Sequence, residues 1–129
     1  MSAALNGLGA LTLFAEDLPR TAAFYRDVFG LALLFEDDNS AVFGFGGTVI
    51  NVLQADAAHE LIEPAPVGGP DAGRRMQLTV WVEDADAVCA QLQEHGVGLL
   101  NGPVDRPWGK RTAAFADPAG HVWEVAQDL

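Results

Sequence analysis

The chain has 129 residues, of which 50% are hydrophobic and 19% charged, and its formal net charge is −11. This length favours a single domain over residues 1–129, and the apolar fraction excludes intrinsic disorder. No apolar run approaches the ~20 residues of a membrane-spanning helix, and the few basic residues do not favour nucleic-acid binding. Residues 1–10 lack the basic start of a secretory signal, and the single Cys89 cannot form an internal disulfide. We therefore expect a cytoplasmic protein with no membrane or nucleic-acid partner.

The first half of the chain predicts a strand, a helix and three further strands. Residues 9–15 have a β-type composition. Asp17 is a suitable N-cap, Pro19 is tolerated in a first helical turn, and Gly30 provides a helix stop. Three apolar runs follow, separated by polar or glycine-rich turns. These runs are residues 31–36, 41–45 and 48–54.

The second half of the chain repeats this order of elements. Residues 77–82 form the first expected strand, and Asp84 or Asp86 caps a helix that ends at Gly96. The apolar stripe of that helix includes Cys89, which we therefore expect to pack in the core. The later strands are expected at residues 97–100, 111–116 and 122–126.

Two segment pairs show that the halves are duplicates. Residues 10–17 align with 77–84 at an offset of 67, and residues 47–52 align with 120–125 at an offset of 73. The sequence therefore predicts an α+β fold of two tandem βαβββ modules, at about 5–56 and 74–127. Residues 57–73, rich in Ala, Pro and Gly, form the linker. Two curved mixed sheets of this kind would enclose a cleft.

Three segments carry a resemblance to a known superfamily: residues 11–18, 24–31 and 108–124. They resemble the vicinal oxygen chelate proteins, which include glyoxalase I, bleomycin-resistance proteins and extradiol dioxygenases. The resemblance implies the same paired-module fold over nearly the whole chain. It does not choose between enzymes and binding proteins, because this fold hosts both.

The resemblance also implies four metal-ligand positions, on the first and last strands of each half. In this sequence they are Ala10, Asn51, Gln77 and Glu124. Ala10 has no donor atom, and the two amides are weaker ligands than imidazole. His59, His95 and His121 fall outside these positions and are expected at the surface. We therefore predict no cofactor, while a divalent metal completed by water or by a partner subunit stays an alternative.

The candidate site residues combine one carboxylate with amides and aromatic rings. Glu124 is the candidate general base, since a carboxylate among apolar neighbours suits that role or metal binding. Strand alternation places Phe14 and Trp81 on the face of the four positions, and Trp108 lies in a polar turn where it could stack on a planar ligand. The candidate ligand-binding residues are Gln77, Asn51, Trp108, Trp81, Phe14, Phe43, Phe45 and Arg111. The alternatives are that most of these aromatic rings fill the core and that Gln77 hydrogen-bonds to Glu124.

Three functions fit these residues. The first is a metal-free protein of the bleomycin-resistance type that sequesters a planar aromatic drug or metabolite, neutral or cationic because the chain is acidic. The second is a lyase or isomerase similar to glyoxalase I that uses Gln77 and Glu124, and the third is a metal-free enzyme with Glu124 as base. A dioxygenase is not expected, because its two histidine ligands are absent. The resemblance implies a homodimer, and the modules could pair within one chain or across the dimer.

Overall fold

The computed structural model describes residue 5 and residues 7–129. The expectation that no secretory signal is present falls partly on residues 1–4 and 6, which lie outside the described residues. The chain divides into two compact units, residues 1–67 and 68–129, and the two expected modules fall one in each unit. None of the helices in the described part of the chain has the length and apolar character needed to cross a membrane.

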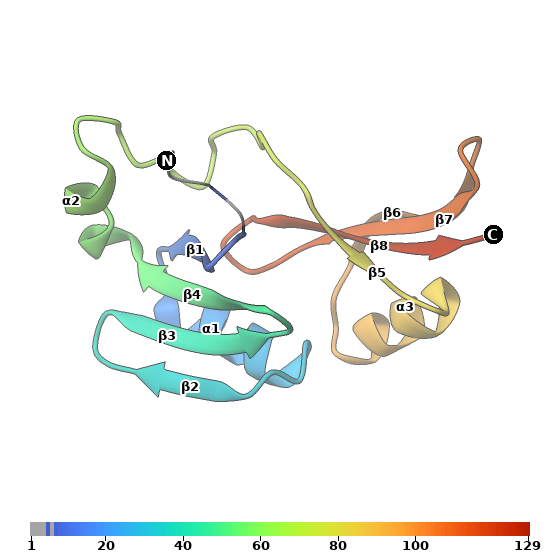
Figure 1. The fold of residues 1–129 in the computed structure, drawn as a ribbon, viewed down its shortest axis with the longest axis horizontal. Helices are drawn as coiled ribbons and strands as arrows, with labels where there is room; N and C mark the ends of the chain where they lie inside the picture. Colours follow the sequence, from blue (N-terminus) through green and yellow to red (C-terminus); the bar gives the residue numbers. More distant parts are fainter. Residues whose placement is uncertain (1–4, 6) are drawn as a thin grey trace. The chain divides into compact units, whose positions relative to one another are not determined.

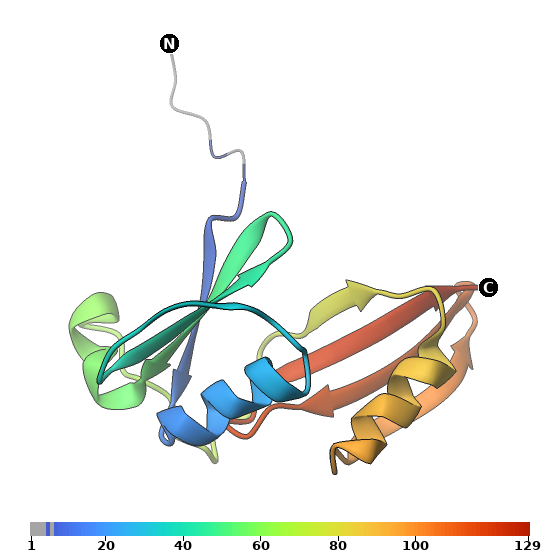
Figure 2. The same ribbon diagram turned by 90° about the horizontal axis from the view of Figure 1, so that it is seen from below.

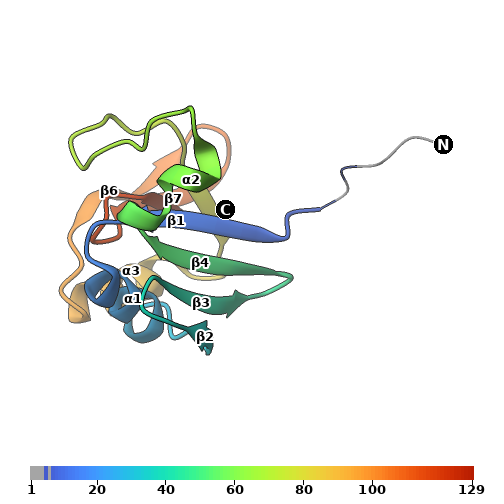
Figure 3. The same ribbon diagram turned by 90° about the vertical axis from the view of Figure 1, so that its left-hand side faces the viewer.

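The first unit is a four-stranded sheet with one helix of ten residues, α1. The strand order is β1-β4-β3-β2, as Figure 3 shows, with β1 parallel to β4 and the other pairs antiparallel. Two short helices follow β4 (Figure 1). The elements are β1 (Ala10–Ala15), α1 (Leu18–Asp27), β2 (Leu33–Glu36), β3 (Ser40–Phe45), β4 (Thr48–Gln54), η1 (Ala55–Ala57) and α2 (His59–Ile62).

The second unit has the same topology. Its strand order is β5-β8-β7-β6, again with one parallel pair, β5 and β8. Helix α3 lies along one face of this sheet (Figure 2). The elements are β5 (Leu78–Trp81), α3 (Ala85–Glu94), β6 (Leu99–Arg106), β7 (Lys110–Ala116) and β8 (Val122–Asp128).

Equivalent strand registers confirm the duplicated βαβββ modules and the α+β fold. In the first sheet Thr12 pairs with Asn51, and in the second Thr79 pairs with Glu124. These are the partners that offsets of 67 and 73 require. The structure differs from the sequence-based elements in β6, which extends to Arg106 through a register shift instead of ending near residue 100.

Each helix is fixed to its own sheet by the same pair of side chains. Asp84 accepts a hydrogen bond from the backbone N–H of Ala87, and Gln127 on β8 accepts one from the N–H of Ala85 at 2.8 Å. In the first unit the equivalent acceptors are Asp17 and Gln54. The two aspartates are N-caps, as predicted, whereas the glutamines were not predicted. They satisfy helix N–H groups that have no partner within the helix.

The hydrophobic core of each unit lies between its sheet and its long helix. Strand alternation divides each sheet into a helix-facing side and a second side, which we call the open face. On β5, for example, Thr79 and Trp81 are exposed, whereas Leu78 and Val80 are half-buried on the helix-facing side. The largest buried core side chains are Tyr25, Phe43, Ile50 and Val52 in the first unit and Trp123 and Phe115 in the second.

Candidate functional site

The open face of the second unit has a floor of small side chains. On β7 and β8, Thr112, Ala114 and Ala126 are at most 4% exposed and lie on the same side of the sheet as Glu124. Their small size leaves the centre of this face without a bulky side chain. Larger polar and aromatic groups surround it, supplied by β5, β6 and the turn between β6 and β7. We call this area the unit 2 floor.

Glu124 borders the unit 2 floor from β8. Its Oε1 accepts a hydrogen bond from the Oγ1 of Thr79 at 3.0 Å, and its side chain is half-buried. The apolar neighbours Trp123 and Val125 do not surround this carboxylate, because alternation places them on the helix-facing side. Glu124 is therefore an acceptor at the side of an open face, held in place by a threonine, and not a carboxylate enclosed by apolar groups.

Trp81 offers an indole surface on the same face. It is 72% exposed, on the strand that also carries Thr79. The Lys110 ammonium lies 5.2 Å from the centre of its ring and also pairs with Asp128. An exposed indole whose orientation is limited by a neighbouring cation is a suitable stacking surface for a planar ligand.

Arg106 extends over the unit 2 floor from β6. Its Nε donates to the Oγ1 of Thr112 at 3.0 Å, and its Nη2 donates to the Oδ1 of Asn101 at 3.1 Å. The guanidinium carbon also lies 5.9 Å from the centre of the Trp108 ring, and that ring is 66% exposed in the β6–β7 turn. The predicted exposure of Trp108 is therefore confirmed, and Arg106 is the group that contacts it.

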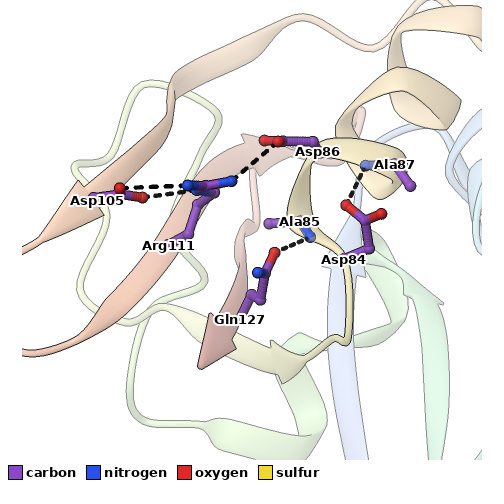
Figure 4. A network of polar contacts seen from close by, with 7 residues as sticks. All are labelled: Asp84, Ala85, Asp86, Ala87, Asp105, Arg111 and Gln127. Carbon is purple, nitrogen blue, oxygen red and sulfur yellow. Dashed lines mark hydrogen bonds and ion pairs between the residues drawn. The ribbon is translucent and has the colours of Figure 1, made fainter. Parts of the chain in front are cut away.

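Arg111 lies on the helix-facing side, away from the unit 2 floor, and is engaged in ion pairs there, so its predicted contact with a ligand stays a prediction. Figure 4 shows its guanidinium between Asp105 and Asp86, with N–O distances of 2.7 and 3.1 Å. The hydrogen bonds and charge of Asp105 raise the pKa of Arg111, and Arg111 in turn lowers the pKa of Asp105. The same view shows Gln127 reaching the first turn of α3. This network joins strands to helix and is structural.

Phe43 and Phe45 also occupy the helix-facing side, in the first unit. Phe43 is buried with its ring centre 6.3 Å from that of Tyr25, and the Phe45 ring lies 6.1 Å from that of Phe29. They share one face, as alternation requires, and that face packs against α1, with Phe43 buried and Phe45 half-buried. Phe14, in contrast, is half-buried on the open face of its own unit, as predicted.

The remaining predicted positions differ in their surroundings. The Oδ1 of Asn51 is buried and has no hydrogen-bond partner. Gln77 is exposed immediately before β5, and Thr79 is the residue that bonds to Glu124. Ala10 is exposed at the start of β1. Each residue is described within its own unit, so their predicted arrangement around one shared cleft stays a prediction.

The four predicted metal-ligand positions offer a poor donor set for a divalent metal, since Ala10 has no donor atom and Asn51 and Gln77 offer only neutral amides. Among the described residues, no three His, Cys, Asp or Glu side chains come together in an arrangement that could hold a metal ion. His59 and His95 are exposed, whereas His121 is half-buried with its Nδ1 2.8 Å from the Oδ2 of Asp117. Cys89 is buried in the core as predicted, and this burial raises the pKa of its thiol. We therefore assign no step to a metal.

Two site residues, Thr79 and Arg106, were not identified from the sequence as site residues. The signal for Thr79 was present in the repeat, because Thr12 and Thr79 occupy equivalent positions on the open faces. The signal for Arg106 was its position two residues before the exposed Trp108. Both are polar residues of a predicted strand or turn, where exposure alone explains their presence.

The family model for the Glyoxalase/Bleomycin resistance protein/Dioxygenase superfamily matches residues 7–125. The chain belongs to this superfamily. The uncharacterized protein YraH from Bacillus subtilis is 31% identical over 124 residues, which cover 92% of this chain and 96% of YraH. Metallothiol transferase FosB from Shouchella clausii is 26% identical, over 94% of this chain and 80% of FosB.

A solved structure of the same fold is that of TnmS3, an antibiotic binding protein from Streptomyces sp. CB03234. It is 26% identical, has a TM-score of 0.74, and covers 99% of this chain and 100% of its own. The glyoxalase-superfamily relatives therefore include a transferase, a ligand-binding protein and an uncharacterized protein. Membership in the superfamily establishes the fold. The specific function must be argued from the residues of the site.

Proposed function

We propose that this protein binds a planar aromatic small molecule on the unit 2 floor without converting it. The observation that carries this proposal is the exposed indole of Trp81 on the same face as Glu124, beside a floor of alanine and threonine side chains. A flat ligand can stack on the exposed indole and donate a hydrogen bond to the carboxylate at the side of the floor.

Stacking and hydrogen bonds together can give micromolar affinity at this site. Burial and stacking of an aromatic ring on one indole contribute on the order of 1–3 kcal/mol. Micromolar binding requires about −8 kcal/mol in total, so two such contacts need additional hydrogen bonds and a site that is already formed. The bonds that hold Glu124 and Arg106 in place supply part of that preorganisation.

Binding without metal chemistry is the simplest use of these residues. Ala10 supplies no ligand, Asn51 and Gln77 supply neutral amides, and Glu124 is engaged by a threonine hydroxyl. A lyase similar to glyoxalase I would need a metal donor set that these positions lack. The unpaired Oδ1 of Asn51 is a further feature that a ligand donor could satisfy, on the open face of the first unit.

The description of TnmS3 as an antibiotic binding protein supports an antibiotic as the ligand class, and a role in antibiotic resistance is part of this proposal. We place the protein in the cytoplasm, where a lone buried cysteine needs no disulfide partner.

The test of the proposed function is a fluorescence and thermal-shift screen with planar aromatic compounds. A ligand should quench tryptophan emission, and Trp81→Ala or Trp108→Ala should weaken its binding about tenfold because each removes one stacking surface. Glu124→Gln should weaken cationic ligands more than neutral ones, since only a cation loses a charge partner. Leu61→Ala is the control, because Leu61 is an exposed apolar residue of the first unit. An unchanged signal across the screen would refute the proposal.

We also propose that the protein forms a homodimer through the edge strand β2. Three consecutive residues of this strand, Leu33, Leu34 and Phe35, are 41–61% exposed. An apolar edge strand with free backbone groups is a surface that natural proteins normally cover. Light scattering at micromolar concentration should give twice the chain mass, and Leu34→Lys should shift it towards the monomer. A monomeric mass for the unmodified protein would contradict this proposal.

A further inference from the structure

We infer that the ligand of the unit 2 floor carries an acidic oxygen group, a carboxylate or a phosphate, which binds to the guanidinium of Arg106. This inference rests on the proposed function and specifies the ligand chemistry at one side of the site. It starts from the charges on β6 and β7 and not from the net charge of the chain.

Arg106 differs from the other basic residues of this hairpin in its partners. Lys110 pairs with Asp128, and Arg111 pairs with both Asp105 and Asp86. The hydrogen-bond partners of the Arg106 guanidinium are a threonine hydroxyl and an asparagine carbonyl, both neutral. Among the described residues, no carboxylate forms an ion pair with Arg106. Its positive charge is therefore available to a ligand.

The strand register places this charge across the floor from Glu124. Asn101, a partner of Arg106, lies opposite Ala114 on one side, and Glu124 lies opposite Ala114 on the other. Asn101 and Glu124 therefore flank the same small residue, the Arg106 guanidinium reaches this place through its bond to Asn101, and Arg106 and Glu124 do not form an ion pair with each other. A molecule placed over Ala114 can donate a hydrogen bond to the Glu124 carboxylate at one side and contact the Arg106 guanidinium at the other.

The planar guanidinium of Arg106 binds an oxygen anion better than a cation without fixed donor directions would. A guanidinium has five N–H donors in a planar fork, and two of them are used by Thr112 and Asn101. These bonds limit the orientation of the fork before the ligand arrives, and donors remain for a carboxylate or phosphate. The nearby Trp108 ring provides an apolar surface for the part of the ligand that bears the acid.

The net charge of −11 favours a neutral or cationic ligand, and the local arrangement revises that expectation. Exposed charges farther away than about 8–10 Å are largely screened at physiological salt. The group that contacts the ligand therefore decides its preference, and at this side of the floor that group is a cation. Glu124 still favours a donor or cation at the other side, so the preferred ligand is an aromatic molecule with both kinds of group.

The experiment compares two probes that differ only in the acid, 2-naphthoate and 2-naphthamide, by titration calorimetry. Naphthoate should bind to the unmodified protein at least tenfold more tightly, and Arg106→Gln should remove this difference without weakening naphthamide more than twofold. Arg20→Gln is the matched control, since it removes the same charge from an exposed site in the first unit. Titration with 2-naphthyl phosphate then distinguishes a phosphate preference from a carboxylate preference.

The outcomes separate this inference from the proposed function. If both probes bind equally and Arg106→Gln changes neither, the acidic-group inference is wrong while aromatic binding stands. If neither probe binds, both proposals are overturned. Should Arg106→Gln fail to fold, Arg106→Lys keeps the charge but loses the planar fork and should weaken naphthoate severalfold. A naphthoate affinity that does not fall with added salt would also count against an anion site.

Discussion

Trp123→Ala is expected to lower the free energy of unfolding by about 3–5 kcal/mol, because truncation of a buried aromatic side chain removes its apolar contacts and leaves a cavity. Trp123 is 1% exposed on the helix-facing side of β8, where it pairs with Phe115 on β7 and Leu78 on β5. Such a loss is a large share of the stability of a domain of this size. Urea unfolding followed by circular dichroism measures it.

Trp108→Ala is the control for this prediction, because it removes the same side chain from an exposed turn. Its free energy of unfolding, measured without ligand, should change by less than about 0.5 kcal/mol, as for most surface substitutions. Equal effects of the two substitutions would contradict the burial of Trp123 in the core and the exposure of Trp108 in the β6–β7 turn.

Gly102→Ala is expected to destabilise the protein by several kcal/mol. Gly102 has a φ of +86°, and a Cβ there would lie 2.3 Å from the carbonyl oxygen of Thr112 and 2.8 Å from the Cα of Ala113. Positive φ costs a residue with a side chain roughly 1–2 kcal/mol, and the overlap with the backbone of β7 adds to that cost. The melting temperature should fall by 10 °C or more, on the order given by the entropy of unfolding.

Gly109→Ala separates the two causes. Gly109 also has a positive φ, of +82°, but nothing lies within 4 Å of the Cβ position. Gly109→Ala should lower the free energy of unfolding only by the cost of the positive φ, about 1–2 kcal/mol. A Gly102→Ala effect no larger than that of Gly109→Ala would mean that β6 moves away from β7 without penalty, in conflict with their pairing.

Most of the fold could be predicted from the sequence, because both halves of the chain carry the same indications of where helices and strands begin and end. Asp17 in the first half and Asp84 or Asp86 in the second indicated where the helices begin, and the two offsets agreed on the order of elements along the chain. A single helix or strand signal is ambiguous, whereas two copies that must fold alike restrict the alternatives. The pairing of β6 contains two register shifts; the first, between Leu99 and Asn101, has a counterpart in β2 between Leu33 and Phe35, and the second, between Asn101 and Val104, has none. The predicted element ended too early just before this second shift.

The site was only partly predictable, since alternation shows which residues share a face but not which face the helix covers. Phe43 and Phe45 were placed together correctly, yet their common face packs against α1. Arg106 and Arg111 lie on either side of one turn, and only the pairing of β6 with β7 shows that they point to opposite sides. Partner identity is a property of three-dimensional contacts, so the neutral partners of Arg106 could not be inferred.

The matched aspartate and glutamine pairs have an evolutionary consequence. The residues that attach each helix to its sheet are identical in both copies, as Asp17 with Asp84 and Gln54 with Gln127 show. Thr12 and Thr79 also match on the open faces, whereas other open-face positions differ: Phe14 against Trp81, Asn51 against Glu124 and Ala10 against Gln77. One repeated scaffold therefore presents two chemically distinct surfaces. New binding specificities can arise by changing one copy while the other continues to support a working protein.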